Sequence, residues 1–146
     1  MQLLVNYRWL PARQEDILRT DPTVNDLSVL VGMAARHRVD PPRLDQSSDP
    51  FWRAAVFLEE CVLLRPLPAR NEAYGYGIAL AYLEASGEPV DAAYELWNAL
   101  ITEIRSMRLD SRTIAERLRS WRIQTGHASH WRTARAATSS SRRPRL

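Results

Sequence analysis

The chain has 146 residues, 45% of them hydrophobic, which is enough for one domain with a modest core and at most a tail. All 20 basic side chains are arginine, so Schiff-base catalysis by lysine and a lysine-bearing phosphate loop are both excluded. No run of about 18 apolar residues is present and the first residues do not resemble a signal peptide, so neither a membrane span nor an export signal is expected.

The net charge of +3 is unevenly distributed along the chain. Residues 122–146 contain six arginines and no acid, whereas residues 1–121 contain 14 arginines and 17 acids, a net charge of −3. This contrast predicts a mildly acidic domain over 1–121 and a basic tail over 122–146, whose lack of periodicity favours disorder. One cysteine, Cys61, excludes an internal disulfide and is typical of a reducing compartment, so we expect a cytoplasmic protein.

Residues 1–10 alternate loosely and predict a short strand or an irregular N-terminal arm, and two helical patterns follow them. A short helix is predicted over about 12–20 and a longer one over 24–37, where apolar residues recur at i, i+3, i+4 and i+7. Asn25 or Thr23 is the expected N-cap of the longer helix. His37 is expected to be a cation at its C-terminal end.

Residues 38–50 have the composition of a loop, and two strongly apolar helices are predicted after it. The first covers about 50–64, with Asp49 as its N-cap and a proline in its first position. The second covers about 72–86 and ends at Gly87, the residue type that best adopts a left-handed C-terminal cap. Both should be buried on most sides.

Two more helices complete the predicted fold. Asp91 is the expected N-cap of a helix over 92–107, and Asp110 or Ser111 that of a last helix over 112–121. The fold class is therefore all-α, a compact bundle of about six helices followed by a basic, disordered tail.

The loop between the two apolar helices is the most informative segment. Residues 65–77 read Arg-Pro-Leu-Pro-Ala-Arg-Asn-Glu-Ala-Tyr-Gly-Tyr-Gly. Two prolines stop the first helix, and the N-terminus of the second presents backbone N–H groups without an intrahelical acceptor. In a helical protein this is where an anion site is built.

Several segments, taken in order, resemble one known family. They are Val24 to Leu30, Ala54 to Cys61, the loop that begins at Arg65, Ile78 to Gly87, and Leu109 to Arg119. Their order is similar to that of the Fic/Doc family, whose signature loop reads His-Pro-Phe-x-Asp-Gly-Asn-x-Arg. The resemblance covers residues 1–121 and implies a compact helical bundle of the Fic/Doc type.

In that family the signature histidine is a general base, the acid holds Mg²⁺ and the basic residues hold phosphates while a nucleotide or phosphate moves to a protein hydroxyl. The matching positions here keep only the proline and the asparagine; they are Arg65, Pro66, Leu67, Ala69, Arg70, Asn71 and Ala73. Arginine stays protonated and cannot act as a base, and alanine binds neither metal nor phosphate. We therefore expect no transfer by the family mechanism and no metal; a nucleotide could bind but would not be turned over.

The resemblance then implies a catalytically degenerate binding or regulatory protein, such as a pseudo-toxin or an accessory subunit of a toxin–antitoxin system. A protein is the expected partner. The expected ligand-binding residues are Arg65, Arg70, Asn71 and Tyr74. Tyr74 has two interpretations, because it could stack on a ligand ring or pack in the core.

A second interpretation is an enzyme with new chemistry on the same scaffold. Arg65 and Arg70 would clamp an anionic or phosphorylated small molecule, and a glutamate would serve as acid or base. The candidates are Glu59, Glu60 and Glu72. The alternative for the two arginines is a surface ion pair with Glu72 or Glu60, and the alternative for the glutamates is a solvated helix face.

A third interpretation places function in the tail, where arginines and Trp131 could bind nucleic acid or an acidic partner. Nucleic acid is not expected to bind elsewhere on the chain. His127 and His130 have a spacing that occurs in metal sites, but no further ligand lies near them in the sequence.

Overall fold

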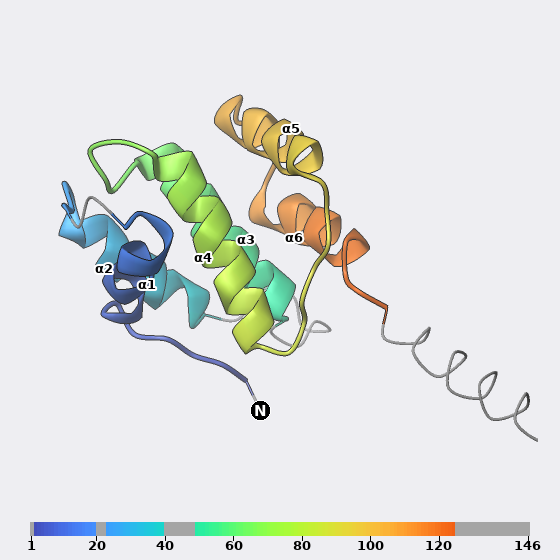
Figure 1. The fold of residues 1–146 in the computed structure, drawn as a ribbon, viewed down its shortest axis with the longest axis horizontal. Coiled ribbons are helices and arrows are strands. Elements are labelled where there is room, and N and C mark those ends of the chain that lie inside the picture. Colours follow the sequence, from blue (N-terminus) through green and yellow to red (C-terminus); the bar gives the residue numbers. More distant parts are fainter. Residues whose placement is uncertain (1, 20–22, 40–48, 125–146) are drawn as a thin grey trace, which may run out of the picture.

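The computed structural model describes residues 2–19, 23–39 and 49–124, which form six helices and no named strand (Figure 1). The predicted all-α class is confirmed for this part of the chain. Most of the predicted loop over 38–50 and the region predicted to be disordered, 125–146, lie outside the described residues. None of the described helices combines the length and the apolar character that a membrane span requires.

All six helices lie within three residues of the predicted bounds. They are α1 (Trp9–Ile17), α2 (Leu27–His37), α3 (Pro50–Leu64), α4 (Asn71–Ala85), α5 (Tyr94–Arg105) and α6 (Ser111–Ser120).

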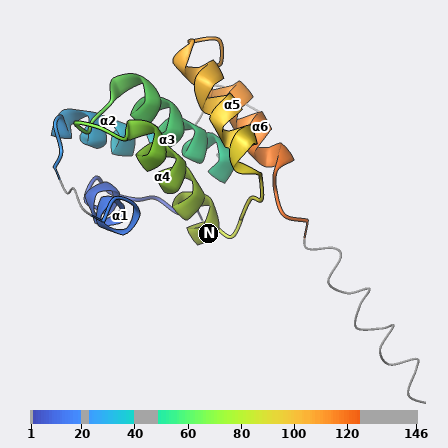
Figure 2. The same cartoon turned by 45° about the horizontal axis from the view of Figure 1, so that its top comes forward.

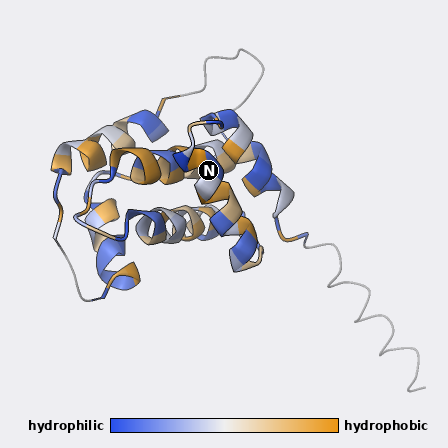
Figure 3. Ribbon diagram, turned by 90° about the horizontal axis from the view of Figure 1, so that it is seen from above, coloured by the Kyte–Doolittle hydropathy of each residue, from blue (hydrophilic) through white to orange (hydrophobic). Residues whose placement is uncertain are grey.

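Helix α3 is the centre of the bundle. It packs against α2, α4, α5 and α6, while α1 packs against α4. Figures 1 and 2 show α1 and α2 on one side of the α3–α4 pair and α5 and α6 on the other. Since α3 is apolar on nearly every side, it can be covered all round. Figure 3 shows that hydrophobic residues are spread over several helices and are not confined to one of them.

Three helices begin with an aspartate cap, and one of these caps differs from the prediction. Asp49 accepts from Phe51 N at 2.8 Å and Asp110 from Thr113 N at 2.8 Å, as predicted. Helix α2 is capped by Asp26, which accepts from Ser28 N at 3.0 Å, so the prediction of Asn25 or Thr23 is wrong. The backbone N–H of Asn25 instead donates to the carbonyl of Pro66, in the loop between α3 and α4.

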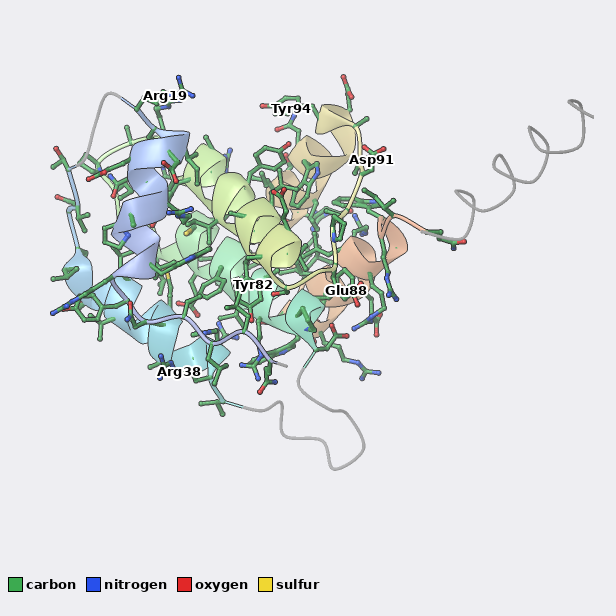
Figure 4. The ribbon with its side chains drawn as sticks, turned by 60° about the horizontal axis from the view of Figure 1, so that its bottom comes forward. Arg19, Arg38, Tyr82, Glu88, Asp91 and Tyr94 are labelled. Atoms are coloured by element: carbon green, nitrogen blue, oxygen red, sulfur yellow. The ribbon has the colours of Figure 1, made fainter. Side chains whose placement is uncertain are left out.

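Helix α5 begins later than predicted, and Asp91 is not its cap. Ala93 occupies the N-cap position without a side-chain bond. Asp91 N–H donates to Trp121 O at 2.9 Å, in an isolated antiparallel bridge between Val90 and Arg122. This bridge ties the segment after α4 to the segment after α6; Figure 4 shows Asp91 on the side where α6 ends.

The left-handed cap predicted at the end of α4 is confirmed. Gly87 has φ +76°, its N–H donates to Glu84 O at 3.1 Å, and Glu88 N–H donates to Leu83 O at 2.9 Å. These two bonds form a Schellman motif.

Replacement by alanine should have opposite effects on stability at Gly75 and at Gly32. A Cβ at Gly75 would lie 2.9 Å from Cβ of Cys61 on α3, whereas a Cβ at Gly32 on α2 would meet no heavy atom within 4 Å. We expect Gly75→Ala to destabilise the fold by about 1–3 kcal/mol, because both Cβ atoms are fixed to helix backbones. Gly32→Ala should stabilise it by about 0.5–1 kcal/mol through helix propensity. Urea denaturation measures both; a Gly75→Ala variant at least as stable as the parent would contradict the close approach.

Candidate functional site

The loop between α3 and α4 consists of residues 65–70, the segment whose sequence resembles a known signature loop. It begins and ends with arginines in the left-handed region, Arg65 at φ 48° and Arg70 at φ 61°. This conformation is uncommon for residues other than glycine. It reverses the chain within six residues, so that α4 returns along α3.

The side chain of Asn71 holds the loop closed. Its Oδ1 accepts from Leu67 N at 2.8 Å, and its Nδ2 donates to Leu67 O at 2.9 Å. Asn71 is fully buried and Leu67 nearly so. The amide predicted to contact a ligand is therefore occupied by the backbone of its own loop.

A carbonyl of the loop also fixes it to the start of α2. Pro66 O accepts from Asn25 N at 2.9 Å and from Asp26 N at 3.0 Å. Proline has no N–H of its own. The carbonyl of Pro66 is therefore the backbone group through which this residue binds the start of α2. The same contact explains why α2 begins no earlier than Leu27.

Arg65 forms an ion-pair network with Glu72. Arg65 Nη1 lies 2.8 Å from Glu72 Oε1, and Arg105 Nη2 of α5 lies 2.7 Å from the same oxygen. Burial alone would raise the pKa of Glu72, but hydrogen bonds from Arg65, its own backbone and Arg105 outweigh burial and hold this pKa below its usual value. Glu72 is thus a carboxylate at neutral pH and unsuited to act as a general acid.

Glu59 and Glu60 belong to a different network, formed with α2 and α6. Arg36 forms ion pairs with Glu60 and, at 3.5 Å, with Glu59. Arg36 Nη2 also donates to Ser111 Oγ at 2.8 Å, and that hydroxyl donates to Glu59. The three candidate glutamates are therefore divided between two networks, and both satisfy carboxylates with protein donors.

Tyr74 lies in the core. It is fully buried, and its hydroxyl donates to Leu10 O at 2.7 Å. Burial raises the pKa of this phenol. Of its two interpretations, the structure agrees with core packing, because a buried ring offers no face to a ligand.

Arg70 is the one predicted ligand-binding residue whose side chain remains available. It is exposed, and within 2–19, 23–39 and 49–124 it has no ion pair or side-chain hydrogen bond. The N-cap residue of α4 is Arg70 itself, whose side chain makes no capping bond, and among the first N–H groups of the helix that of Glu72 is bound by its own carboxylate. Within the described residues, Arg70 is therefore an unpaired guanidinium beside a helix N-terminus that is only partly satisfied.

Metal-binding chemistry has no evident donor set in the described part of the chain. No group of three or more His, Cys, Asp or Glu side chains there could hold an ion. His127 and His130 lie outside the described residues.

The sequence did not predict Arg36 and Ser111 as partners of Glu59 and Glu60. Arg36 and Ser111 lie 75 positions apart and meet because α2 and α6 both pack on α3. No local pattern marks such a pair.

Comparisons with known proteins add no relative: no family model, curated protein or solved structure matches this chain.

Proposed function

We propose that this chain is a Fic/Doc-like domain that has lost nucleotide transfer and acts by binding a protein partner, as a pseudo-toxin or accessory subunit. The proposal is supported by a helix–loop–helix with the expected bounds, α3 and α4, and by the retained Pro66 and Asn71. Both retained residues hold the loop in place, through the Pro66 carbonyl and the Asn71 amide.

The loss of transfer follows from the side chains of the loop. Arg65, at the position of the family's base, is a permanent cation bound to Glu72. Ala69 and Ala73 offer no ligand for Mg²⁺ or phosphate. The observation that carries the proposal is that Arg65, Asn71 and the Pro66 carbonyl are bound by the protein itself, whereas apolar side chains next to the loop are exposed.

These apolar side chains and Arg70 form what we name the loop-end surface: Leu27, Val31, Leu64 and Arg70. Leu64 is 53% exposed and Leu27 52%, and they come from two helices joined at Pro66 O. Val31 lies one turn after Leu27, on the same face of α2. Exposed leucines and an exposed arginine on segments that meet at this loop favour a partner segment that combines apolar and acidic residues.

Peptide display tests this surface. A random peptide library selected on the full chain should yield sequences that combine leucine-like and acidic residues. Leu27→Glu and Leu64→Glu should each weaken the binding of such a peptide at least tenfold. The matched control is Met107→Glu, which changes an exposed apolar residue between α5 and α6 and should leave binding unchanged. Equal losses in all three variants would contradict the proposed surface.

Nucleotide binding is tested separately by thermal unfolding. ATP or GTP with Mg²⁺ should leave the unfolding temperature unchanged. Binding would be detected, because a ligand at 100 times its Kd would stabilise the fold by about 2.7 kcal/mol. Transfer of labelled nucleotide to a protein hydroxyl would contradict the loss of activity.

A second candidate function, binding of an anionic small molecule, is favoured by Arg70 at the start of α4, where the N-cap side chain makes no hydrogen bond to the helix. Inorganic phosphate is the probe in the same assay. Stabilisation that disappears in Arg70→Ala would support this function over the first. Deleting residues 125–146 should change neither result; a loss on deletion would place the function in the tail.

A further inference from the structure

The N-terminal arm, residues 2–8, is held against the ends of α2 and α4 through its main chain. Arg38 Nε and Nη2 donate to Val5 O at 3.2 and 3.0 Å, and the Tyr82 hydroxyl donates to Leu3 O. Figure 4 shows the arm passing Tyr82 and Arg38. The arm therefore depends on a few side-chain bonds to its backbone and on the packing of Val5 and Leu3 against the core, rather than on a helix or strand of its own.

His37 makes one of these bonds and is not the exposed cation expected from its place at the end of α2. Val5 N–H donates to His37 Nε2 at 3.0 Å, and Nδ1 lies within hydrogen-bonding distance of Ala34 O. Since a carbonyl only accepts, the proton is assigned to Nδ1 and the lone pair to Nε2. The ring is thus neutral, and it is fully buried.

The surroundings of the ring oppose a positive charge. Its centroid lies 4.9 Å from that of Phe57 and 6.1 Å from that of Tyr82. Among the described residues, the charged or titratable groups that face it are Arg38 on α2, Arg53 on α3 and Tyr82 on α4. Burial first, then the charges of Arg53 and Arg38, outweigh the Ala34 bond and lower the pKa of His37 to about 4.

We propose that His37 is a proton-operated latch, whose neutral ring holds the arm in place and whose protonation releases it. A proton from solvent binds Nε2, the atom that accepts from Val5. The ring then carries N–H groups at both nitrogens, and Val5 N–H faces a second donor instead of an acceptor. The cation and the docked arm exclude each other, so the protonated ring becomes solvated as the arm leaves.

The direction of the pH effect follows from linkage. Once the arm is released and the ring exposed, its pKa returns toward the ordinary 6.5, above the value of about 4 in the latched state. The released state therefore binds more protons between these values, and its population rises as the pH falls through that window. For a change from pH 7.5 to pH 5.0, the two pKa values predict an increase of about 30-fold in the opening equilibrium.

Amide hydrogen exchange measured by NMR on the full chain tests the latch. The protection factor of the Val5 amide, corrected for the intrinsic exchange rate, should fall about 30-fold between pH 7.5 and pH 5.0. Low urea concentrations should affect it less than they affect global unfolding, because release of the arm exposes only part of the core surface, including that of Val5 and His37. The Ile78 amide of α4 reports global unfolding for comparison. A pH-independent Val5 amide, or one with the protection and urea dependence of Ile78, would overturn the latch.

Two substitutions separate the proton from the packing. In His37→Gln a side-chain oxygen can still accept from Val5 N–H but cannot titrate, so the pH effect on the Val5 amide should disappear; an undiminished effect would overturn the proposal. Tyr82→Phe removes a hydrogen bond to the arm and changes no charge at these pH values. It should lower Val5 protection equally at both pH values and leave the 30-fold change intact, and loss of that change would count against His37 as its origin.

Discussion

Replacing Asn71 with alanine is expected to destabilise the protein by about 2–4 kcal/mol. The substitution removes both hydrogen bonds to Leu67, at 2.8 and 2.9 Å, and leaves a buried N–H and a buried carbonyl without partners. Each such group costs about 1–3 kcal/mol, more than the net value of an ordinary hydrogen bond. Urea denaturation followed by circular dichroism gives the change directly.

Asn98 provides the matched control. It is an exposed asparagine within α5, and Asn98→Ala should change stability by no more than about 0.5 kcal/mol. Asn71→Asp should also destabilise the protein, because a buried carboxylate can accept from Leu67 N but faces Leu67 O without a donor. If Asn71→Ala were as stable as Asn98→Ala, the asparagine would not be what closes the loop.

Trp97→Ala is expected to have the largest effect of all, a loss of about 3–5 kcal/mol. Trp97 is 1% exposed, and its ring centroid lies 4.7 Å from that of Tyr76 and 5.1 Å from that of Trp121. It thereby connects α5 with α4 and with the end of α6. Alanine would remove both ring contacts and leave a cavity among three helices.

Circular dichroism is the appropriate measurement for Trp97, because the substitution itself alters tryptophan fluorescence. Trp97→Phe keeps an aromatic ring and should lose less than half as much. Tyr94, 70% exposed at the start of the same helix, is the control, and Tyr94→Ala should cost no more than about 0.5 kcal/mol. A Trp97→Ala variant that loses less than 1 kcal/mol would mean that α5 is held by other contacts.

The sequence predicts the helices well where their ends carry local signals. Asp49 and Pro50 mark the start of α3, and Gly87 marks the end of α4, because capping depends on residues within a few positions of each other. Asp26 was missed as the cap of α2 because three neighbouring residues could cap equally well. The bond from Asn25 N to Pro66 O decides among them, across a distance in sequence that no local rule covers.

The candidate site is less predictable, because the same side chain can face a ligand or the protein. Asn71 and Tyr74 are polar residues beside a loop, yet the backbones of Leu67 and Leu10 satisfy them inside the fold. His37 is at a helix end, where a cation is favourable, but the N-terminal arm covers it. Each outcome depends on which distant backbone atom lies nearby, and that information is in the packing.

The bridge between Val90 and Arg122 holds the end of the described chain against the segment that follows α4. It lies just beyond the C-terminal end of α4, whereas residues 65–70 adjoin the opposite end of that helix. A helix of 15 residues measures about 22 Å, so the two places form opposite poles of the domain. The last described residues therefore lie about one helix length away from Arg70.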